Sequence, residues 1–284
     1  MERSATAKGK LMLIGGNVDK GSGLEENDGT TGSIQFFHLG ILERIIRELK
    51  GDCSRIEIIS TASMIPEEVG QEYVKAFHKI GCGNVGLLPI GIDMKGDNEE
   101  VIRRIMDCDG VMFTGGDQVT LIKKLSNSKV IREIKRRYRE EEDFLVSGTS
   151  AGAMALGEQM IEKGKPSQSL VKGNVSLGSG FGFLNELLID THFVQRGRFS
   201  RLIEAIAGNP DLLGIGLGED TAVLLKNQIL ETVGTNLVSI IDGKNILKNN
   251  YLDIKPGEPV CVENIGLHII ATNHQFTLKD RRVL

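Results

Sequence analysis

Short apolar runs alternate with amphipathic stretches along the first half of the chain. The apolar runs lie at residues 11–16, 55–60, 85–90, 110–116 and 144–148. Helical periodicity lies between them, at residues 34–49, after Pro66, at 99–106 and from Lys129 to residue 142. Runs that are apolar along their whole length are typical of strands buried on both faces of a sheet. The alternation of strands and helices therefore predicts βαβ units.

The pattern loosens after residue 165, where glycines cluster. One more helix is expected over residues 196–207, and short strands at 221–226 and 228–233 suggest antiparallel hairpins. No Pro-rich or Ser-rich linker interrupts the chain, so we expect one domain spanning residues 1–284. The predicted fold is α/β, with a mostly parallel sheet flanked by helices and antiparallel strands near the C-terminus.

Composition narrows the class of protein. The 284 residues are 40% hydrophobic and 25% charged, which is enough material for a large packed core. The net charge of -4 gives no field of one sign that would favour nucleic acid or an anionic membrane. The first ten residues lack the apolar run of a signal peptide, and no stretch is apolar for the ~18 residues of a membrane span. We therefore expect a cytoplasmic location.

The cysteines and the short motifs give no sign of a bound cofactor. The four cysteines, Cys53, Cys82, Cys108 and Cys261, form no CxxC pair, and we expect them to be reduced and mostly buried. Neither an HExxH metal motif nor a dinucleotide fingerprint is present. The prediction is that the protein uses no metal and no cofactor.

The segment at 148–152 carries the strongest chemical signal. An apolar strand leads into Gly148-Thr149-Ser150-Ala151-Gly152, and a helix-forming sequence follows. This is the G-x-S-x-G arrangement in its expected strand-turn-helix context, where small residues permit a sharp turn that exposes the serine Oγ. Ser150 is therefore the candidate nucleophile. The alternative is a glycine-rich turn in which the serine only caps a helix.

A second turn, at residues 113–118, ends the preceding predicted strand. In a parallel sheet both turns emerge at the same carboxyl edge and flank one cleft. The backbone N–H groups of Gly115 and Gly116, together with that of Ala151, are candidates for an oxyanion hole. The alternative is a plain tight turn in which Asp117 caps a helix.

A serine nucleophile needs a base and a group that orients it. His192 is the candidate base, because it lies in a strand-like run followed by a polar cluster. The other histidines fall in predicted helices, His38 and His78, or near the end of the chain, His268 and His274. Glu219 follows an apolar strand and is the candidate orienting acid. Asp190 competes, since strand alternation puts it on the same face as His192.

These segments resemble peptidase family S51. The resemblance is carried by FTGGDQ at 113–118, GTSAGA at 148–153, DTHFVQRGRFSRL at 190–202, GEDTA at 218–222 and the opening LMLIGG. It covers nearly the whole chain, and the His192 segment with its spaced arginines is its most specific part. Related amidotransferases of similar three-layer fold, the class I glutamine amidotransferases, carry cysteine at the elbow, and this chain does not.

The resemblance implies a serine-type intracellular exopeptidase that forms a homodimer. It implies a triad of Ser150, His192 and Glu219 and a substrate of cyanophycin, a poly-aspartate with arginine on its side-chain carboxyls, which is cut to β-Asp-Arg dipeptides. It also implies that Gln118 lies near the nucleophile and that Asp190, Arg196, Arg198 and Arg201 line the substrate site. We expect Asp117, Thr191 and Asp220 to bind substrate as well. Thr191 departs from the family pattern, which commonly has glutamine there, and this position bears on substrate identity.

The charges agree with such a substrate. Arg196, Arg198 and Arg201 could bind carboxylates in bidentate fashion, while Asp190 or Asp220 could bind a guanidinium. The alternative is a helix N-terminus with solvated arginines. Two other functions remain open: an aspartyl dipeptidase of the same family, and a binding protein that kept the fold but lost catalysis.

Overall fold

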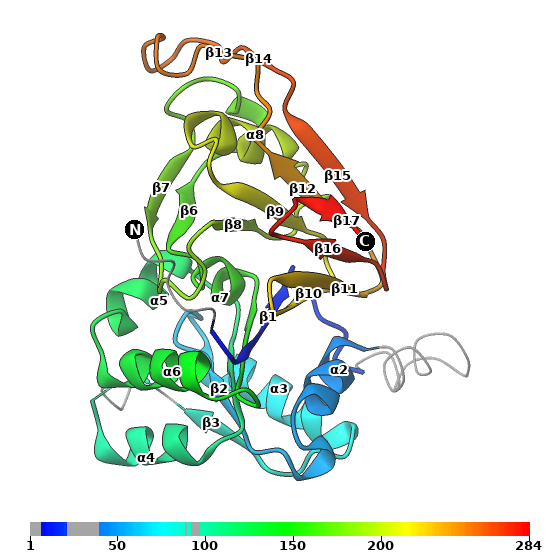
Figure 1. Cartoon of the computed structure of the whole chain (residues 1–284). Coiled ribbons are helices and arrows are strands. Elements are labelled where there is room, and N and C mark those ends of the chain that lie inside the picture. Colours follow the sequence, from blue (N-terminus) through cyan, green and yellow to red (C-terminus); the bar gives the residue numbers. More distant parts are fainter. Residues whose placement is uncertain (1–6, 22–39, 89, 92–96) are drawn as a thin grey trace.

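A nine-stranded mixed sheet forms the centre of the computed structural model, which describes residues 7–21, 40–88, 90–91 and 97–284. The strand order is β17-β16-β11-β10-β1-β5-β4-β2-β3 (Figure 1). Its parallel strands are β1 (Lys10–Ile14), β2 (Ile56–Ile59), β3 (Val85–Leu88), β4 (Gly110–Phe113) and β5 (Leu145–Thr149). The carboxyl ends of all five therefore meet at one edge.

Helices cover both faces of the parallel part. They are α2 (Ile41–Glu48), α3 (Pro66–Lys79), α4 (Glu99–Asp107), α5 (Gln118–Leu125) and α6 (Lys129–Glu140). Alternate residues of β1 face opposite layers: Leu11 and Leu13 pack with α4, α5 and α6, whereas Met12 and Ile14 pack with α2 and α3. The strands read as continuous apolar runs because both of their faces are buried in this way.

Antiparallel strands complete the main sheet, as the sequence predicted. They are β10 (Thr221–Lys226), β11 (Ile229–Gly234), β16 (Gln275–Thr277) and β17 (Arg282–Val283). A two-residue turn joins β10 to β11, with φ of 51° at Asn227 and 62° at Gln228. Positive φ at both central residues is the geometry that suits the twist of a tight hairpin. The fold class is therefore confirmed, including its antiparallel part.

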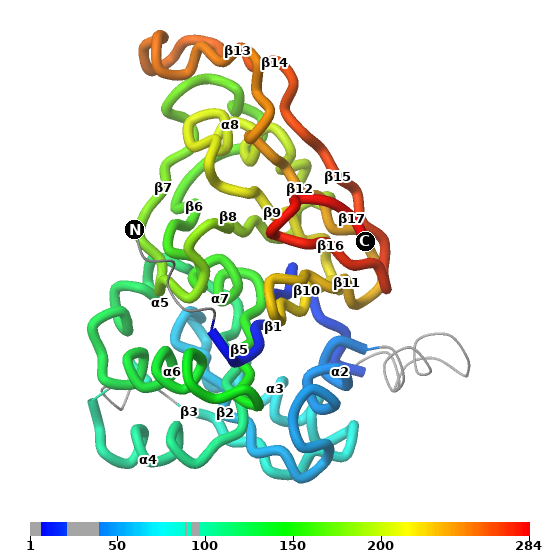
Figure 2. Tube along the Cα trace, in the orientation of Figure 1, coloured from blue at the N-terminus to red at the C-terminus, as the bar shows by residue number. Residues whose placement is uncertain are grey.

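A second sheet, which the sequence did not separate from the first, holds four strands. These are β15 (Gly266–Ile270), β12 (Val238–Asp242), β9 (Leu213–Leu217) and β8 (Leu187–Asp190), in that order. It lies above the main sheet in the views of Figures 1 and 2, with α8 (Phe199–Gly208) packed on it through Leu202 and Ile206. Ile215 and Ile240 of this sheet share a hydrophobic core with Leu13 of the main sheet.

Shorter elements fill the remainder of the described chain. They are α7 (Ala151–Met154), β6 (Gln159–Lys163), β7 (Ser176–Ser179), β13 (Lys248–Asn249), β14 (Val262–Glu263), and the 3-10 turns η2 (Gly51–Cys53) and η3 (Pro166–Gln168). In the described part of the chain, no helix is both long and apolar enough to cross a membrane.

Two expectations about single elements need comment. The helix expected at residues 34–49 is seen as α2 from Ile41, and its first part, with His38, lies outside the described residues. All four cysteines are free thiols, but only Cys82 and Cys108 are buried; Cys53 and Cys261 are exposed. The expectation of burial is wrong for these two because they lie in η2 and in the loop before β14, outside the packed layers.

Candidate active site

Ser150 sits at a strained turn between β5 and α7. Its backbone has φ 52° and ψ -118°, a conformation that a residue other than glycine rarely adopts. Both neighbouring glycines are required by close backbone contacts. A Cβ at Gly148 would lie 2.7 Å from the carbonyl carbon of Gly152, and a Cβ at Gly152 would lie 2.4 Å from the Phe113 carbonyl oxygen. The G-x-S-x-G sequence thus folds as a nucleophile elbow.

A chain of hydrogen bonds joins the three predicted catalytic residues. Ser150 Oγ lies 3.0 Å from His192 Nε2, and His192 Nδ1 lies 2.7 Å from Glu219 Oε1. Nδ1 donates to the carboxylate when Nε2 is left free to accept the serine proton. Glu219, and not Asp190, therefore orients the imidazole.

The two sheets bring these residues together. Ser150 follows β5 in the main sheet, whereas His192 follows β8 and Glu219 follows β9 in the second sheet. Glu219 also precedes β10, and because β10 runs antiparallel to β1, its amino end lies where the parallel strands end. The site is therefore built at the line where the ends of both sheets meet.

The double glycine after β1 connects the two sheets at this line. His192 N–H donates to the Gly15 carbonyl at 2.8 Å, and Asp220 N–H donates to the Gly16 carbonyl at 2.9 Å. A Cβ at Gly15 would lie 1.9 Å from the Gly218 carbonyl oxygen, and one at Gly16 would lie 2.5 Å from His192 Nε2. Gly16 also has φ 103°, so only glycine fits against the imidazole.

Three polar residues that sequence reasoning missed hold Glu219 in place. Asn17 Nδ2 donates to Glu219 Oε2 at 3.2 Å, and the Glu219 N–H donates to Gln195 Oε1 at 3.1 Å. Asn236 Nδ2 donates to the Glu219 carbonyl at 2.9 Å. Asn17 could have been found, because it follows the end of a parallel strand, and Gln195 lies inside the family motif at 190–202. No sequence pattern marks Asn236.

The local electrostatics suit a base at neutral pH. Burial lowers the pKa of His192, the hydrogen bond with Glu219 acts in the opposite direction, and the positive charge of Arg196 lowers it further. The hydrogen bond from His192 lowers the pKa of Glu219. A neutral imidazole beside an ionised carboxylate is the state from which a serine proton can be taken.

The predicted oxyanion hole lies beside the nucleophile. A Cβ at Gly115 would lie 3.4 Å from Ser150 Cβ and 3.9 Å from its Oγ. Gly116 has φ 143°, and a Cβ there would lie 2.1 Å from the Ala62 carbonyl oxygen. No described residue accepts a hydrogen bond from the backbone N–H of Gly115, Gly116 or Ala151. These groups stay candidates for stabilising an oxyanion.

Asp190 lies in a buried group of charges. Its carboxylate is fully buried and accepts from Arg201 Nε at 2.7 Å, from Arg201 Nη2 and from Arg198 Nη1 at 3.0 Å. Arg201 Nη1 in turn donates to the Gly164 carbonyl at 3.0 Å. Both oxygens of the Asp190 carboxylate are therefore used inside the protein, and the substrate contacts expected for Asp190 and Arg201 stay predictions. Thr191 is also buried, with its hydroxyl 3.4 Å from Met154 Sδ.

Arg198 and Arg196 remain available to a ligand. Arg198 uses Nη1 for Asp190 and for the Thr191 carbonyl, at 2.7 Å, but its buried Nε has no partner among the described residues. Burial lowers the pKa of this guanidinium, while Asp190 raises it. Arg196 is exposed, and within the described ranges it forms no ion pair. Nε is thus a buried donor without a described partner, whereas Nη2, which forms no hydrogen bond with a described residue, can donate to a carboxylate.

Three other residues that are predicted to contact substrate form hydrogen bonds within the protein. Asp117 caps α5 by accepting from the Thr120 N–H at 2.6 Å, as the alternative interpretation of this turn had it. Gln118 Nε2 donates to the Ile161 carbonyl at 2.9 Å. Asp220 accepts from the Asp19 N–H at 3.1 Å and from Thr235 Oγ1 at 3.0 Å, and burial raises its pKa. Its oxygens support the loops behind Glu219.

Several known proteins are similar to this chain over most of its length. The family model of peptidase family S51 matches residues 31–233. The cyanophycinase of Thermosynechococcus vestitus is 32% identical over 277 residues, covering 97% of this chain and 81% of that protein. The cyanophycinase of Trichormus variabilis is 33% identical over 285 residues, covering 100% and 90%. A crystal structure of a peptidase from an acI-B1 Actinobacterium has a similar fold, with a TM-score of 0.64, 19% identity and coverage of 96% and 98%.

Proposed function

This chain belongs to peptidase family S51, and we propose that it is a serine-type exopeptidase that hydrolyses cyanophycin to β-Asp-Arg dipeptides. The observation that carries the proposal is the hydrogen-bonded series from Ser150 through His192 to Glu219. The substrate rests on relatives named cyanophycinase, which are similar over nearly the full chain. A binding protein without catalysis would have no need of this geometry.

Catalysis would begin at the elbow. His192 Nε2 accepts the proton of Ser150 as Oγ attacks the scissile carbonyl, and Glu219 stabilises the imidazolium that forms. The N–H groups of Gly115, Gly116 and Ala151 are proposed to bind the oxyanion of the tetrahedral intermediate. His192 then gives its proton to the leaving amine. Water hydrolyses the resulting acyl-enzyme by the same steps, and Ser150 recovers its proton.

Substrate recognition is proposed to use Arg198 and Arg196. In cyanophycin each arginine is joined through its amino group to an aspartate side chain, so every unit carries a free carboxylate and a free guanidinium. Nη2 of Arg198, which forms no hydrogen bond with a described residue, can donate to such a carboxylate, and so can the exposed guanidinium of Arg196. The buried pair of Asp190 and Arg198 holds the Arg198 guanidinium in place, so less entropy is lost when the substrate binds.

Two further proposals follow from the family resemblance. We propose that the enzyme is a homodimer and that it acts in the cytoplasm, where a storage polymer would be degraded. Size-exclusion chromatography with light scattering tests the first, and fractionation of the source cells tests the second.

The test of function is to incubate the purified enzyme with cyanophycin and identify the released products by mass. The expected product is β-Asp-Arg. Ser150→Ala should lower the rate by about 10⁶, because removal of a triad nucleophile leaves only binding and oxyanion stabilisation. Ser126→Ala, at the exposed end of α5, is the matched control and should keep full activity.

Other outcomes would point elsewhere. Intact cyanophycin together with hydrolysed aspartyl dipeptides would identify the protein as an aspartyl dipeptidase of the same family. If Ser150→Ala retained more than a few per cent of activity with an unchanged far-UV spectrum, the assignment of the nucleophile would be wrong.

A further inference from the structure

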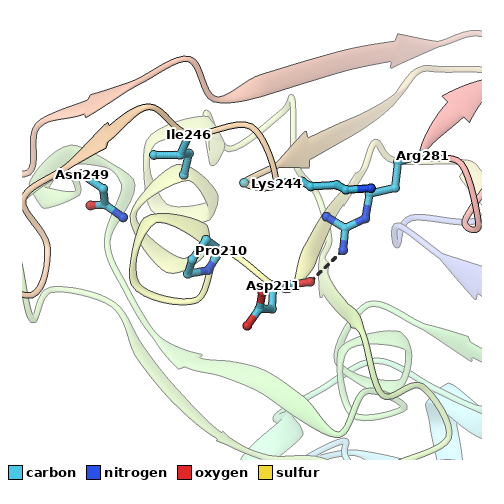
Figure 3. A pocket seen from close by; sticks show the side chains of 7 residues that line it. Pro210, Asp211, Lys244, Ile246, Asn249 and Arg281 are labelled. Atoms are coloured by element: carbon cyan, nitrogen blue, oxygen red, sulfur yellow. Dashed lines mark hydrogen bonds between the residues drawn. The ribbon is translucent and has the colours of Figure 1, made fainter. Parts of the chain in front are cut away.

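A pocket of about 460 Å³ lies in the second sheet region, away from Ser150. Its lining residues include Pro210, Asp211, Lys244, Ile246, Asn249 and Arg281. In Figure 3, Asn249 lies at one end of the pocket and Arg281 at the other, with Asp211 between them. We refer to this hollow as the distal pocket.

The distal pocket and the catalytic residues lie at opposite ends of β9. Asp211 comes two residues before β9 begins at Leu213, and Glu219 comes two residues after β9 ends at Leu217. A strand rises by about 3.3 Å per residue, so the eight steps between the two positions span roughly 26 Å of extended chain. A ligand in the distal pocket therefore leaves Ser150 free.

One side of the distal pocket is fixed by an ion pair that is already satisfied. Arg281 Nη1 donates to Asp242 Oδ1 at 2.6 Å, and Nη2 donates to the Asp211 carbonyl at 2.8 Å. The side chains of this pair are only 16% and 8% exposed. Gly243 lets the chain pack tightly here, since a Cβ on it would lie 2.8 Å from Pro210 Cα. This part of the pocket is preformed.

The remaining charges of the distal pocket have opposite signs. The carboxylate of Asp211 and the ammonium of Lys244 are exposed, and neither forms a hydrogen bond or an ion pair with any described side chain. Because Arg281 and Asp242 neutralise each other, the pocket offers one free acid and one free base. Its charge pattern fits a ligand that carries both a cation and an anion.

A larger hollow of about 820 Å³ adjoins the distal pocket, since Arg281 lines both. It is lined by Lys135, Arg139 and Lys279 and by one acid, Glu186. Basic groups therefore predominate beyond the distal pocket. They can bind the carboxylates of further units of a polymer that passes through the distal pocket.

We propose that the distal pocket is a second binding site for the polymer, with a guanidinium at Asp211 and a carboxylate at Lys244. This inference rests on the proposed function, which supplies a polymer with both groups in every unit. Exposed ion pairs contribute little individually, so one unit binds weakly. A polymer presents many units to two sites on one enzyme, and the second contact then forms at a high effective concentration. The distal pocket would keep the enzyme on its substrate between cleavage events.

The test separates binding from cleavage. In a Ser150→Ala background, which cannot consume the polymer, the change Asp211→Asn with Lys244→Gln should weaken co-sedimentation with insoluble cyanophycin about tenfold. The matched control is Asp253→Asn with Lys255→Gln, an exposed acid and base that line neither hollow, and it should leave binding unchanged. With Ser150 intact, the distal variant should hydrolyse a soluble dimer of β-Asp-Arg units at the parental rate.

Equal binding by the distal and control variants would overturn the proposal, as would a loss of dimer hydrolysis equal to the loss of polymer binding. Lys244→Glu alone provides an independent variant, because reversal of one exposed charge preserves the fold and should weaken binding to a similar extent. Failure of the proposed function would be distinguishable, since the enzyme with Ser150 would then release no β-Asp-Arg from the polymer or from the dimer.

Discussion

Two pairs of an acid and a base meet near the carboxyl end of β8, and they differ in their access to solvent. In the first pair, Glu219 and His192 are 26% and 12% exposed, and Nε2 of the imidazole lies next to Ser150 Oγ. In the second, Asp190 and Arg201 are 0% and 8% exposed, and the carboxylate is fully used. Asp190 and His192 are only two residues apart along the chain. Yet the pair that contains His192 can exchange protons with a substrate, and the pair that contains Asp190 cannot.

The difference is one that residue type alone does not reveal, because both pairs consist of an acid and a base. A partly open pair can change its protonation state during a reaction, because solvent and substrate reach it. A fully buried pair stabilises the local structure only as long as both charges are present, since either one alone would be an uncompensated buried charge. Asp190 and Arg201 therefore support the segment that carries His192 and Arg198.

The largest predicted effect is the loss of kcat when the pair of Glu219 and His192 is disrupted. Glu219→Gln should lower kcat by about 10⁴, because the amide cannot stabilise the imidazolium and favours the wrong tautomer. Asp220→Asn, the neighbouring acid, should lower it by less than about tenfold, since its oxygens only support loops. Steady-state kinetics on cyanophycin measure both. Comparable losses in the two variants would mean that Glu219 does not orient His192.

The second effect concerns stability. Asp190→Ala should lower the free energy of unfolding by about 3–5 kcal/mol, because it leaves Arg201 buried without its partner. Glu219→Gln, on the partly open pair, should lower it by no more than about 1 kcal/mol. Urea denaturation followed by circular dichroism gives both values. An Asp190→Ala variant as stable as the parent would contradict a structural role for the buried pair.

The smallest effect is on the pH profile. Since the protonated imidazole cannot accept the serine proton, kcat/KM should rise with pH through the pKa of His192, which burial holds below its usual value. Arg196→Gln removes a positive charge that lowers this pKa, so the rising limb should move to higher pH. Lys165→Gln, an exposed cation that does not act on His192, is the control. An unchanged limb in Arg196→Gln would show that Arg196 does not influence the base.

The sequence by itself determined the features that depend on short stretches of backbone. The elbow was predictable from five residues because a strand-turn-helix with small residues around Ser150 is a local pattern: a Cβ at Gly148 would meet the start of α7 at Gly152, and one at Gly152 would meet the Phe113 carbonyl at the end of β4. The parallel direction of the strands was predictable from their continuous apolar sequences, because burial of both faces of a strand leaves no alternation of polar residues. His192 was predictable from its own segment together with the family motif that surrounds it.

Only the tertiary structure decided which groups reach one another across the two sheets. Glu219 was the preferred orienting acid in the sequence and Asp190 competed with it; the packing of β8, β9 and β10 brought the first to His192 Nδ1 and buried the second against Arg201. Asn17, Gln195 and Asn236 hold Glu219 from three separate segments, so no local pattern could mark them together. Backbone sterics act over a few residues, so the local sequence specifies them. Burial and hydrogen-bond partners depend instead on segments that meet only after folding.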